Sequence, residues 1–370
     1  MSDVLTTGPD DAAAVAPRGR DDHGGTWTLT PRGVATVLRL ELRQRVRATR
    51  WVVILVVWTA LIGGLTGLIW MAFGPVGEVG EDDTGPLTFG TIVFLVLSLG
   101  SLVAPALSAT SINGDRAAGV LATLQTTLLS PAEIALGKLL AAWTTALALF
   151  VTSAPFIVLA YFAGGTPVGR LLVVLVLLAL MLGVVCAIGL GWSAVAARTS
   201  SSAVLTYLTV AFLGLGLPLL FGLSVPFVTT EEKVQVVSPG FTTGSGRTEC
   251  VRQTETMSVT HTELTWWLLA ASPYVVVSDA SPTQGDDPYP DDPLSAIRAG
   301  VREARLGPPE VRDWCTDTVD DVRARRREEL SATWPYGLAI DLLLATGFVV
   351  VTVRRLRTPS RKLPRGTRVA

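Results

Sequence analysis

The sequence predicts an all-α membrane protein with six transmembrane helices. The 370 residues are 49% hydrophobic and 16% charged, with a mean hydropathy of +0.48, whereas a soluble domain carries about 25% charged residues. Apolar runs almost free of charged residues recur along the chain, and each is long enough to cross a hydrocarbon core of roughly 20 helical residues. Arginines crowd the start of the first run and the end of the last, which is typical of segments that flank membrane helices.

These runs place the spans at about 51–73, 88–110, 139–163, 171–196, 203–226 and 334–353. Pro105, Pro155 and Pro218 fall inside three of them and predict kinks or breaks. The segment 74–86 carries only acids, so the excess of arginine at both ends predicts a multi-pass protein of the cell membrane with both termini in the cytoplasm. Residues 1–32 then form a disordered cytoplasmic lead and 354–370 a basic cytoplasmic tail.

An amphipathic helix is expected over residues 33–50, before the first span. Its apolar residues Val34, Leu38, Leu42 and Val46 recur every four positions. Arg39, Arg43 and Arg47 follow on the adjoining strip, a pattern typical of a helix lying at a membrane interface with its arginines toward lipid headgroups. The alternative is a solvated extension of the first span.

The polar segment between the second and third spans predicts two helices within the unit 51–226. Ala117, Val120, Leu121, Leu124 and Leu128 recur as one apolar stripe, so we expect a helix over 113–130. Ser130, Pro131 and Glu133 then form a capping-box start for a second helix that continues into the third span. The stripe's opposite face has no Lys or Arg for anionic lipid, so a protein groove is favoured as its partner over the inner leaflet.

Residues 227–332 are expected to form a large extracellular insertion between spans five and six. Cys250 and Cys315 both lie there, and an oxidising exterior favours a disulfide between them, the alternative being two unpaired thiols. The apolar segment 266–277 is too short to span a membrane. It predicts a re-entrant or interfacial helix pair hinged at Ser272–Pro273, or else a buried core segment of the outside domain.

The sequence lacks the residues of an enzyme active site. The Gly-Lys pair at 137–138 has no phosphate-binding loop around it, and no HExxH motif or nucleophile–base pair is visible. The four carboxylates of 284–293 do not have the spacing of an EF-hand and favour a solvated loop over a calcium site. Asp341 interrupts the sixth span, either as a substrate-path or gating residue or as an interfacial residue of a helix that begins near Leu338.

The stretch NGDRAAGVLATLQTTLLSPAEIALGK, residues 113–138, resembles the cytoplasmic signature of type-2 ABC exporter permeases. The resemblance implies that the short helix is a coupling helix, which docks on a separate ATP-binding subunit. The family often has Glu where Gly114 or Asp115 stands and Thr where Val120 stands. The positions that match the motif or are expected to take part in coupling are Asp115, Arg116, Gly119, Val120, Leu121, Leu124, Leu128, Pro131, Gly137 and Lys138.

The resemblance implies a non-catalytic permease subunit in a complex with two ATPase copies and a second permease copy or a related permease. It implies no cofactor in this chain, with ATP and Mg²⁺ in the partner, and membrane lipid but no nucleic acid as surroundings. The apolar spans favour export of a hydrophobic or amphipathic cargo, a drug-like compound or a lipid, along a path with Asp341, Phe94, Tyr161 and Tyr207. The alternative is a membrane-anchored sensor or scaffold that binds through its extracellular domain.

Overall fold

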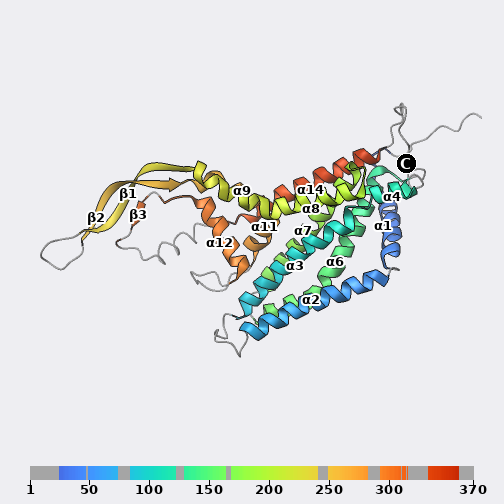
Figure 1. Ribbon diagram of the computed structural model, residues 1–370, viewed down its shortest axis with the longest axis horizontal. Helices are drawn as coiled ribbons and strands as arrows, with labels where there is room; N and C mark the ends of the chain where they lie inside the picture. The colour runs from blue at the N-terminus through green and yellow to red at the C-terminus, as the bar shows by residue number, and fades with distance from the viewer. Residues whose placement is uncertain are drawn as a thin grey trace, which may run out of the picture.

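The computed structural model describes residues 25–46, 49–73, 84–121, 129–163, 168–240, 249–281, 292–309, 311–313, 315 and 332–357. Figure 1 shows a helical bundle with a sheet-bearing arm at one end and the end of the last helix, α14 (Trp334–Leu356), at the other. Six helical stretches of the described chain are long and apolar enough to cross a membrane, in agreement with the sequence. They are Trp51–Ala72, Leu87–Ala117, Pro131–Phe162, Leu171–Val195, Thr199–Phe227 and Trp334–Leu356.

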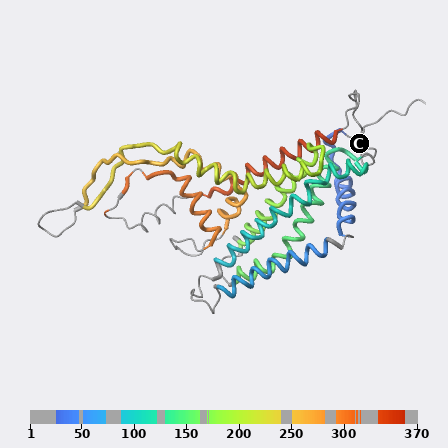
Figure 2. Tube along the Cα trace, in the orientation of Figure 1, coloured from blue at the N-terminus to red at the C-terminus, as the bar shows by residue number. Residues whose placement is uncertain are grey.

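The centre of the bundle is α7 (Val168–Val195), which packs against α3 (Thr84–Ser108), α6 (Pro131–Ala163) and α14 (Trp334–Leu356). Figure 2 traces these four helices side by side. In an 18-residue apolar stretch of the α7 span, 61% of the residues are buried. The sequence of α7 is apolar on every side, so the helix needs neighbours all round. Pro105 lies within α3 and Pro155 within α6, and neither helix is broken there.

Two spans lie at the periphery. In an 18-residue apolar stretch of the first span, α2 (Thr49–Phe73), and in one of the fifth span, only 11% of the residues are buried inside the chain. The fifth consists of α8 (Thr199–Ala211), a π-helical segment η1 (Phe212–Gly216) and α9 (Leu217–Ser224), followed by η2 (Val225–Phe227). A single α-helix is therefore interrupted at Phe212–Gly216, where Gly214 lies against the ring of Tyr274. These apolar faces are suited to lipid or to another membrane helix.

The N-terminal amphipathic helix is α1 (Pro31–Val46), and it is not an extension of the first span. It packs along α6, and Figure 1 shows it at a steep angle to α2. Its buried face carries Gly33, Val37 and Glu41. The expected lipid-facing stripe lies beside this face, with Val34, Leu38 and Leu42 partly buried and Val46 exposed. One side of α1 therefore packs against α6, whereas the sequence had predicted contacts with lipid only.

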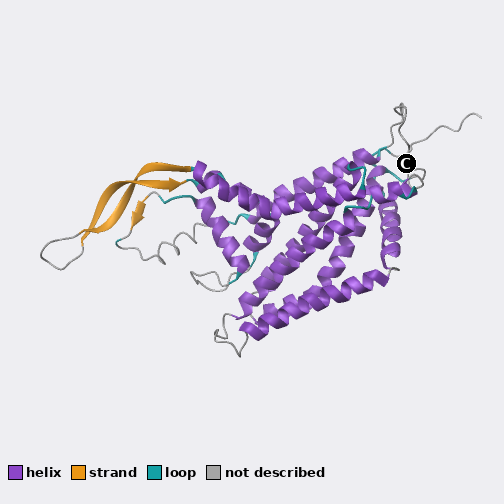
Figure 3. Cartoon of the chain, in the orientation of Figure 1, coloured by secondary structure: helices purple, strands orange, loops and turns teal. Residues whose placement is uncertain are grey.

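The arm carries a three-stranded sheet that the sequence analysis did not predict (Figure 3). Strand β1 (Thr229–Gly240) pairs antiparallel with β2 (Glu249–Thr260), in the register that sets Thr229 opposite Thr260, and β3 (Val311–Asp313) lies parallel to β1. Alternating Val and Thr residues suit such strands. Cys250 of β2 and Cys315 just after β3 form the predicted disulfide, with their Cα atoms 5.8 Å apart.

A cluster of short helices joins the arm to the bundle. These are η3 (Thr262–Leu264), α10 (Trp266–Ala270), α11 (Pro273–Ala280) and α12 (Pro293–Leu306). The segment 266–277 is a pair of short helices divided at Ser272–Pro273, as the sequence indicated. Helix α11 is buried against α7, α12 and α14. Whether this pair re-enters a membrane stays a prediction.

Asp279, at the end of α11, holds this cluster to the last span. One of its carboxylate oxygens accepts a hydrogen bond from Arg302 Nε of α12 at 2.5 Å. The other accepts from the backbone N–H groups of Thr333 at 2.6 Å and Trp334 at 2.8 Å. A carboxylate at the first turn of α14 satisfies donors that have no partner inside the helix, and it complements the helix dipole.

His261, at the base of the hairpin, gives a pH-dependent contact. Its Nδ1 lies 2.7 Å from Glu263 Oε1 and its Nε2 lies 3.0 Å from Glu232 Oε1. The hydrogen bond with Glu263, followed by that with Glu232, raises the pKa of His261 above its usual value of 6.5. A raised histidine pKa means that the contact stabilises the hairpin base fully below the unfolded pKa. That contribution is lost as the pH rises through the folded value.

We therefore expect the histidine NMR titration of the purified protein to give a pKa above 6.5 for His261. The chain has only two histidines, so His23→Asn leaves a single signal to follow. Glu263→Gln should lower this pKa more than Glu232→Gln does, because the bond to Glu263 makes the larger contribution. An unchanged titration curve in Glu263→Gln would contradict the pairing.

Candidate functional site: a polar junction at the end of the bundle

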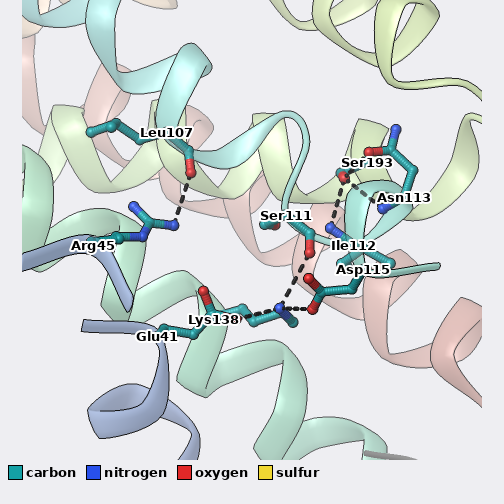
Figure 4. Close-up of polar contacts among 9 residues, drawn as sticks. All are labelled: Glu41, Arg45, Leu107, Ser111, Ile112, Asn113, Asp115, Lys138 and Ser193. Carbon is teal, nitrogen blue, oxygen red and sulfur yellow. Dashed lines mark hydrogen bonds and ion pairs between the residues drawn. The ribbon is translucent and has the colours of Figure 1, made fainter. Parts of the chain in front are cut away.

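A buried cluster of charged side chains joins α1, α6 and α4 (Asn113–Ala117) at the end of the bundle opposite the arm (Figure 4). At its centre is Lys138 of α6, whose side chain is 1% exposed. Its ammonium pairs with Glu41 of α1 at 2.5 Å and with Asp115 of α4, and it donates a third hydrogen bond to the Ser111 carbonyl at 3.2 Å. All three N–H donors of the ammonium are thereby used.

The residue before Lys138 explains how α1 comes so close to α6. A Cβ atom at Gly137 would lie 2.5 Å from Val37 Cβ, which is closer than two carbon atoms can approach. The hydrogen side chain of glycine therefore permits the contact, and Val37 fills the space. This close packing sets Glu41, one helical turn after Val37, within reach of Lys138. The two residues of the Gly-Lys pair therefore act on the same helix. Gly137 leaves room for α1 to pack closely, and Lys138 forms an ion pair with Glu41 of α1.

Arg45, one turn beyond Glu41, extends the junction to α3. Its guanidinium donates to the Leu107 carbonyl at 3.0 Å and to Thr145 Oγ1 of α6 at 3.3 Å. Burial lowers the pKa of Arg45 from its ordinary value, and the negative charge of Glu41 opposes that change. Two cationic and two anionic side chains therefore meet here, which balances the charge in a place that water reaches poorly.

Helix α4 is fixed from its other side by uncharged polar groups. Ser193 of α7 is fully buried, and its hydroxyl accepts hydrogen bonds from the N–H groups of Ile112 at 3.0 Å and Asn113 at 3.2 Å. The same hydroxyl donates to the Asn113 side-chain oxygen at 3.1 Å. Asn113 Nδ2 donates in turn to the Arg198 carbonyl at 3.3 Å. The start of α4 thus rests on α7 while Asp115 rests on α6.

The helix expected over 113–130 is interrupted early. Helix α4 ends at Ala117, and Gly119 adopts a positive φ of 73°. A left-handed residue ends an α-helix because it turns the next N–H groups away from the helical ladder, and glycine adopts this conformation at little cost. Helical geometry resumes at Val120 and Leu121. The prediction of one continuous helix from residue 113 is therefore wrong, because the chain turns at Gly119.

The expected coupling residues lie in different surroundings. Asp115 and Lys138 lie in the junction, Leu121 is 2% exposed and packs with Ile112, Ile134 and Leu190, and Pro131 opens α6. Gly119 and Val120 are exposed and Arg116 is partly exposed. Leu124 and Leu128 lie outside the described residues. The two described leucine and valine positions of the apolar stripe therefore differ: Leu121 packs into the bundle, whereas Val120 is exposed at its surface.

The capping box at the start of α6 is confirmed. Glu133 Oε2 accepts from the N–H of Ser130 at 2.8 Å, and Ser130 Oγ accepts from the N–H of Glu133 at 3.1 Å. The other carboxylate oxygen of Glu133, Oε1, accepts hydrogen bonds from the residue before α1, from Thr30 N at 2.8 Å and from Thr30 Oγ1 at 2.5 Å. The cap therefore ties the entry of α1 to the entry of α6 in addition to completing a helix terminus.

The other predicted site residues lie in separate places. Arg39 and Arg43 are exposed on α1, as an interface role requires, and Arg47 lies outside the described residues. Of the substrate-path candidates, Tyr161 is 2% exposed in the core and Tyr207 is 37% exposed, donating to the Leu102 carbonyl at 3.0 Å. Phe94 packs against Tyr274, 5.5 Å between ring centroids. These aromatic residues therefore do not share one surface.

Glu41, Arg45, Asn113 and Ser193 were not singled out from the sequence. A weak signal was present for Glu41, which is the one acid in an arginine-rich helix. It follows Gly33 and Val37 at intervals of four residues, so it belongs to their face. Ser193 had no signal, because a serine in an apolar span ordinarily bonds its own helix.

The fold and this junction define a multi-pass helical membrane protein in which a short helix between two spans is tied to the third span. The family model described as ABC-2 family transporter protein matches residues 35–278. The chain therefore belongs to the ABC-2 transporter family and is an ABC transporter permease. The matched region begins in α1, ends in α11 and includes every residue of the junction. No curated protein matches the chain.

Replacing Lys138 tests the junction. Lys138→Met removes the ammonium and leaves Glu41 and Asp115 close together without their cation, which should cost about 3–5 kcal/mol of unfolding free energy. Arg39→Met, on the exposed side of α1, is the matched control and should change stability by about 0.5 kcal/mol or less. The measurement is the midpoint of denaturation of the detergent-solubilised protein. Adding Glu41→Gln and Asp115→Asn to Lys138→Met should recover part of the loss, and equal midpoints for Lys138→Met and Arg39→Met would contradict the assignment.

Proposed function

We propose that this permease is the membrane subunit of an ABC exporter and that a separate ATPase drives it. Two copies of an ATP-binding subunit, holding ATP and Mg²⁺, would dock at the end of the bundle that carries α4. The permease itself contributes no catalytic residue in this proposal. It would act as a pair, with a second copy of the chain or with a related permease.

The observation that carries the proposal is the ion pair between the partly exposed Asp115 and the buried Lys138. It connects a short helix in the loop between two spans to the third span, α6, through two charged side chains that cannot separate cheaply. A push on α4 would therefore move α6 instead of being absorbed by a flexible loop. The same ammonium holds α1 through Glu41, so α1 and α6 would respond together.

The charge distribution supports a cytoplasmic location for this end. Its outer surface carries Arg39 and Arg43 on α1 and Arg354, Arg355 and Arg357 at the end of α14. An excess of arginine is typical of cytoplasmic loops and tails. The disulfide in the arm supports the opposite side as the cell exterior, because oxidising conditions maintain such bonds. Both termini would then be cytoplasmic, in the cell membrane.

The exposed apolar faces support a second permease copy and an apolar cargo. The spans of α2 and of α8–η1–α9 are covered least by the rest of the chain, and such faces contact either lipid or another span. No charged residue lies between Arg198 and Glu231 or between Arg50 and Glu78. A path along these faces would favour a hydrophobic or amphipathic molecule, such as a lipid or a drug-like compound.

Val120→Asp tests the docking surface without disturbing the core, since Val120 is 40% exposed whereas Leu121 is buried. A carboxylate at an apolar contact is desolvated without a partner and costs roughly 2 kcal/mol or more. We expect at least about tenfold weaker binding of the ATPase subunit. The assay is affinity purification from the native cells, followed by ATP hydrolysis in the eluate.

Leu264→Asp is the matched control for this experiment. Leu264 is 63% exposed and lies near the arm, at the other end of the molecule, so the same change there should leave ATPase binding intact. Unchanged binding in Val120→Asp would remove this surface from the proposal. A wild-type permease that purifies without any ATP-hydrolysing chain would instead favour a membrane-anchored sensor or scaffold.

The orientation has its own test. With Cys250→Ser and Cys315→Ser in the background, Arg357→Cys should react with a membrane-impermeant maleimide only after the cells are permeabilised, because Arg357 is exposed at the proposed cytoplasmic end. In the parent protein, Cys250 and Cys315 should react in intact cells once they have been reduced. Cys186 is buried and serves as the unreactive reference. Labelling of Arg357→Cys in intact cells would show that this end of the bundle lies outside the cell, and would contradict the proposed orientation.

A further inference from the structure

Asp341 lies in the middle of the packed face of α14. One turn before it, Gly337 lies against the Ala270 carbonyl and the Val276 side chain. Two turns after it, Phe348 packs on Trp192 with ring centroids 5.7 Å apart. Asp341 itself is 0% exposed. Its carboxyl group therefore points into the contact of α14 with α7 and the α10–α11 pair, and away from both lipid and water.

Neither carboxyl oxygen of Asp341 has a hydrogen-bond partner among the residues that the structure describes. The hydroxyls of Ser272, Ser278 and Thr333, in the adjoining α11 and at the start of α14, are likewise buried without a partner. Asp279 provides the contrast, because both of its oxygens are bonded to Arg302, Thr333 and Trp334. Two buried aspartates within one helical assembly are thus in opposite situations.

Within the part of the chain that the structure describes, no charged side chain of a neighbouring helix forms a hydrogen bond with Asp341. The α10 helix has no ionisable residue, and α11 has Tyr274 and Asp279, whose two oxygens are both bonded. Helix α7 has the thiol of Cys186 and, near its start, Arg170, whose side chain lies outside the described part of the structure. On α6 the groups are Glu133, Lys138 and Tyr161, the first two at the opposite end of the bundle. On α14 itself, Tyr336 is five residues before Asp341, about 7.5 Å along the axis, and its exposed ring lies 5.0 Å from the guanidinium carbon of Arg305 of α12. Arg354 is about 20 Å away in the other direction.

A carboxylate in this position would be an isolated charge in an apolar membrane span, the costliest arrangement for an acid. A neutral carboxylic acid avoids that cost and leaves only unmade hydrogen bonds. We propose that Asp341 is a proton-binding site: it holds a proton while α14 is packed against α7 and α11, and it releases the proton when these helices separate.

The chemistry is a simple acid dissociation. The O–H bond of the carboxylic acid breaks, the electron pair stays on oxygen, and the proton passes to water that enters between the helices. Repacking of α14 requires the carboxylate to take a proton back. A link between this proton release and transport depends on the proposed function. The protonation of Asp341 in the packed bundle does not depend on it.

Infrared difference spectroscopy of the purified permease at pH 7 tests the proton directly, without an ATPase partner or a substrate. The spectrum of the wild type minus that of Asp341→Asn should contain the C=O stretching band of one protonated carboxyl group, shifted after exchange into D₂O. The wild type minus Asp279→Asn should contain carboxylate bands instead. Carboxylate bands in the Asp341 difference spectrum would overturn the proposal, even if ATPase coupling were intact.

Thermal denaturation gives a second test, with Asp341→Leu in case the asparagine variant folds poorly. A neutral and unpartnered acid is replaced at no loss, so both Asp341 variants should melt at or above the wild-type temperature. Asp279→Asn should melt lower, because it breaks a partnered site of similar burial. A melting temperature of the Asp341 variants as far below wild type as that of Asp279→Asn would show that Asp341 has a charged partner, and would overturn the proposal.

Discussion

The structure depends on the burial of one ammonium group. Lys138 lies inside the protein near the start of α6, where its charge is stable only because Glu41, Asp115 and the Ser111 carbonyl surround it. Desolvating an amine costs several kcal/mol, and the cost is offset only when every donor is satisfied. Each partner comes from a different part of the chain, so the helices α1 and α4 and the end of the second span must all be in place together. A buried charge of this kind specifies an arrangement more than it adds stability.

The spans themselves supply little specificity, because apolar side chains pack with many neighbours at similar energy. The polar groups lie mainly at the two ends. At one end Lys138 and Arg45 join α1, α3, α4 and α6, and at the other Asp279 joins α11, α12 and α14. The helices between them form one large apolar cluster. In the proposed mechanism, a movement that begins at α4 would be transmitted through the polar contacts at the two ends, and the helices would separate most easily in the apolar middle.

Several local features could be read from the sequence because their physics is local. Ser130, Pro131 and Glu133 form a cap within four residues, and both hydrogen bonds of the cap are present. The disulfide between Cys250 and Cys315 spans 65 residues, and it could be predicted because both cysteines lie in one insertion that was expected to be outside the cell. The break before Pro273 follows from the restriction that a proline imposes on the preceding residue. The turn at Gly119 and the strands of the arm were missed, since an apolar stripe and a Thr-rich segment each fit more than one backbone.

The sequence by itself determined the class of protein, the number of apolar spans and the helix cap at Ser130, because length, hydropathy and short-range hydrogen bonding depend on neighbours in the chain. It also predicted the disulfide, because two cysteines share one insertion. The tertiary structure alone decided which polar residues meet. Glu41 and Lys138 are 97 residues apart in the chain and Asn113 and Ser193 are 80 apart, and no periodicity links such positions. It also decided that Asp279 has hydrogen-bond partners while Asp341 has none among the described residues. The surroundings of a buried acid are set by the packing of helices and not by the residues beside it in sequence.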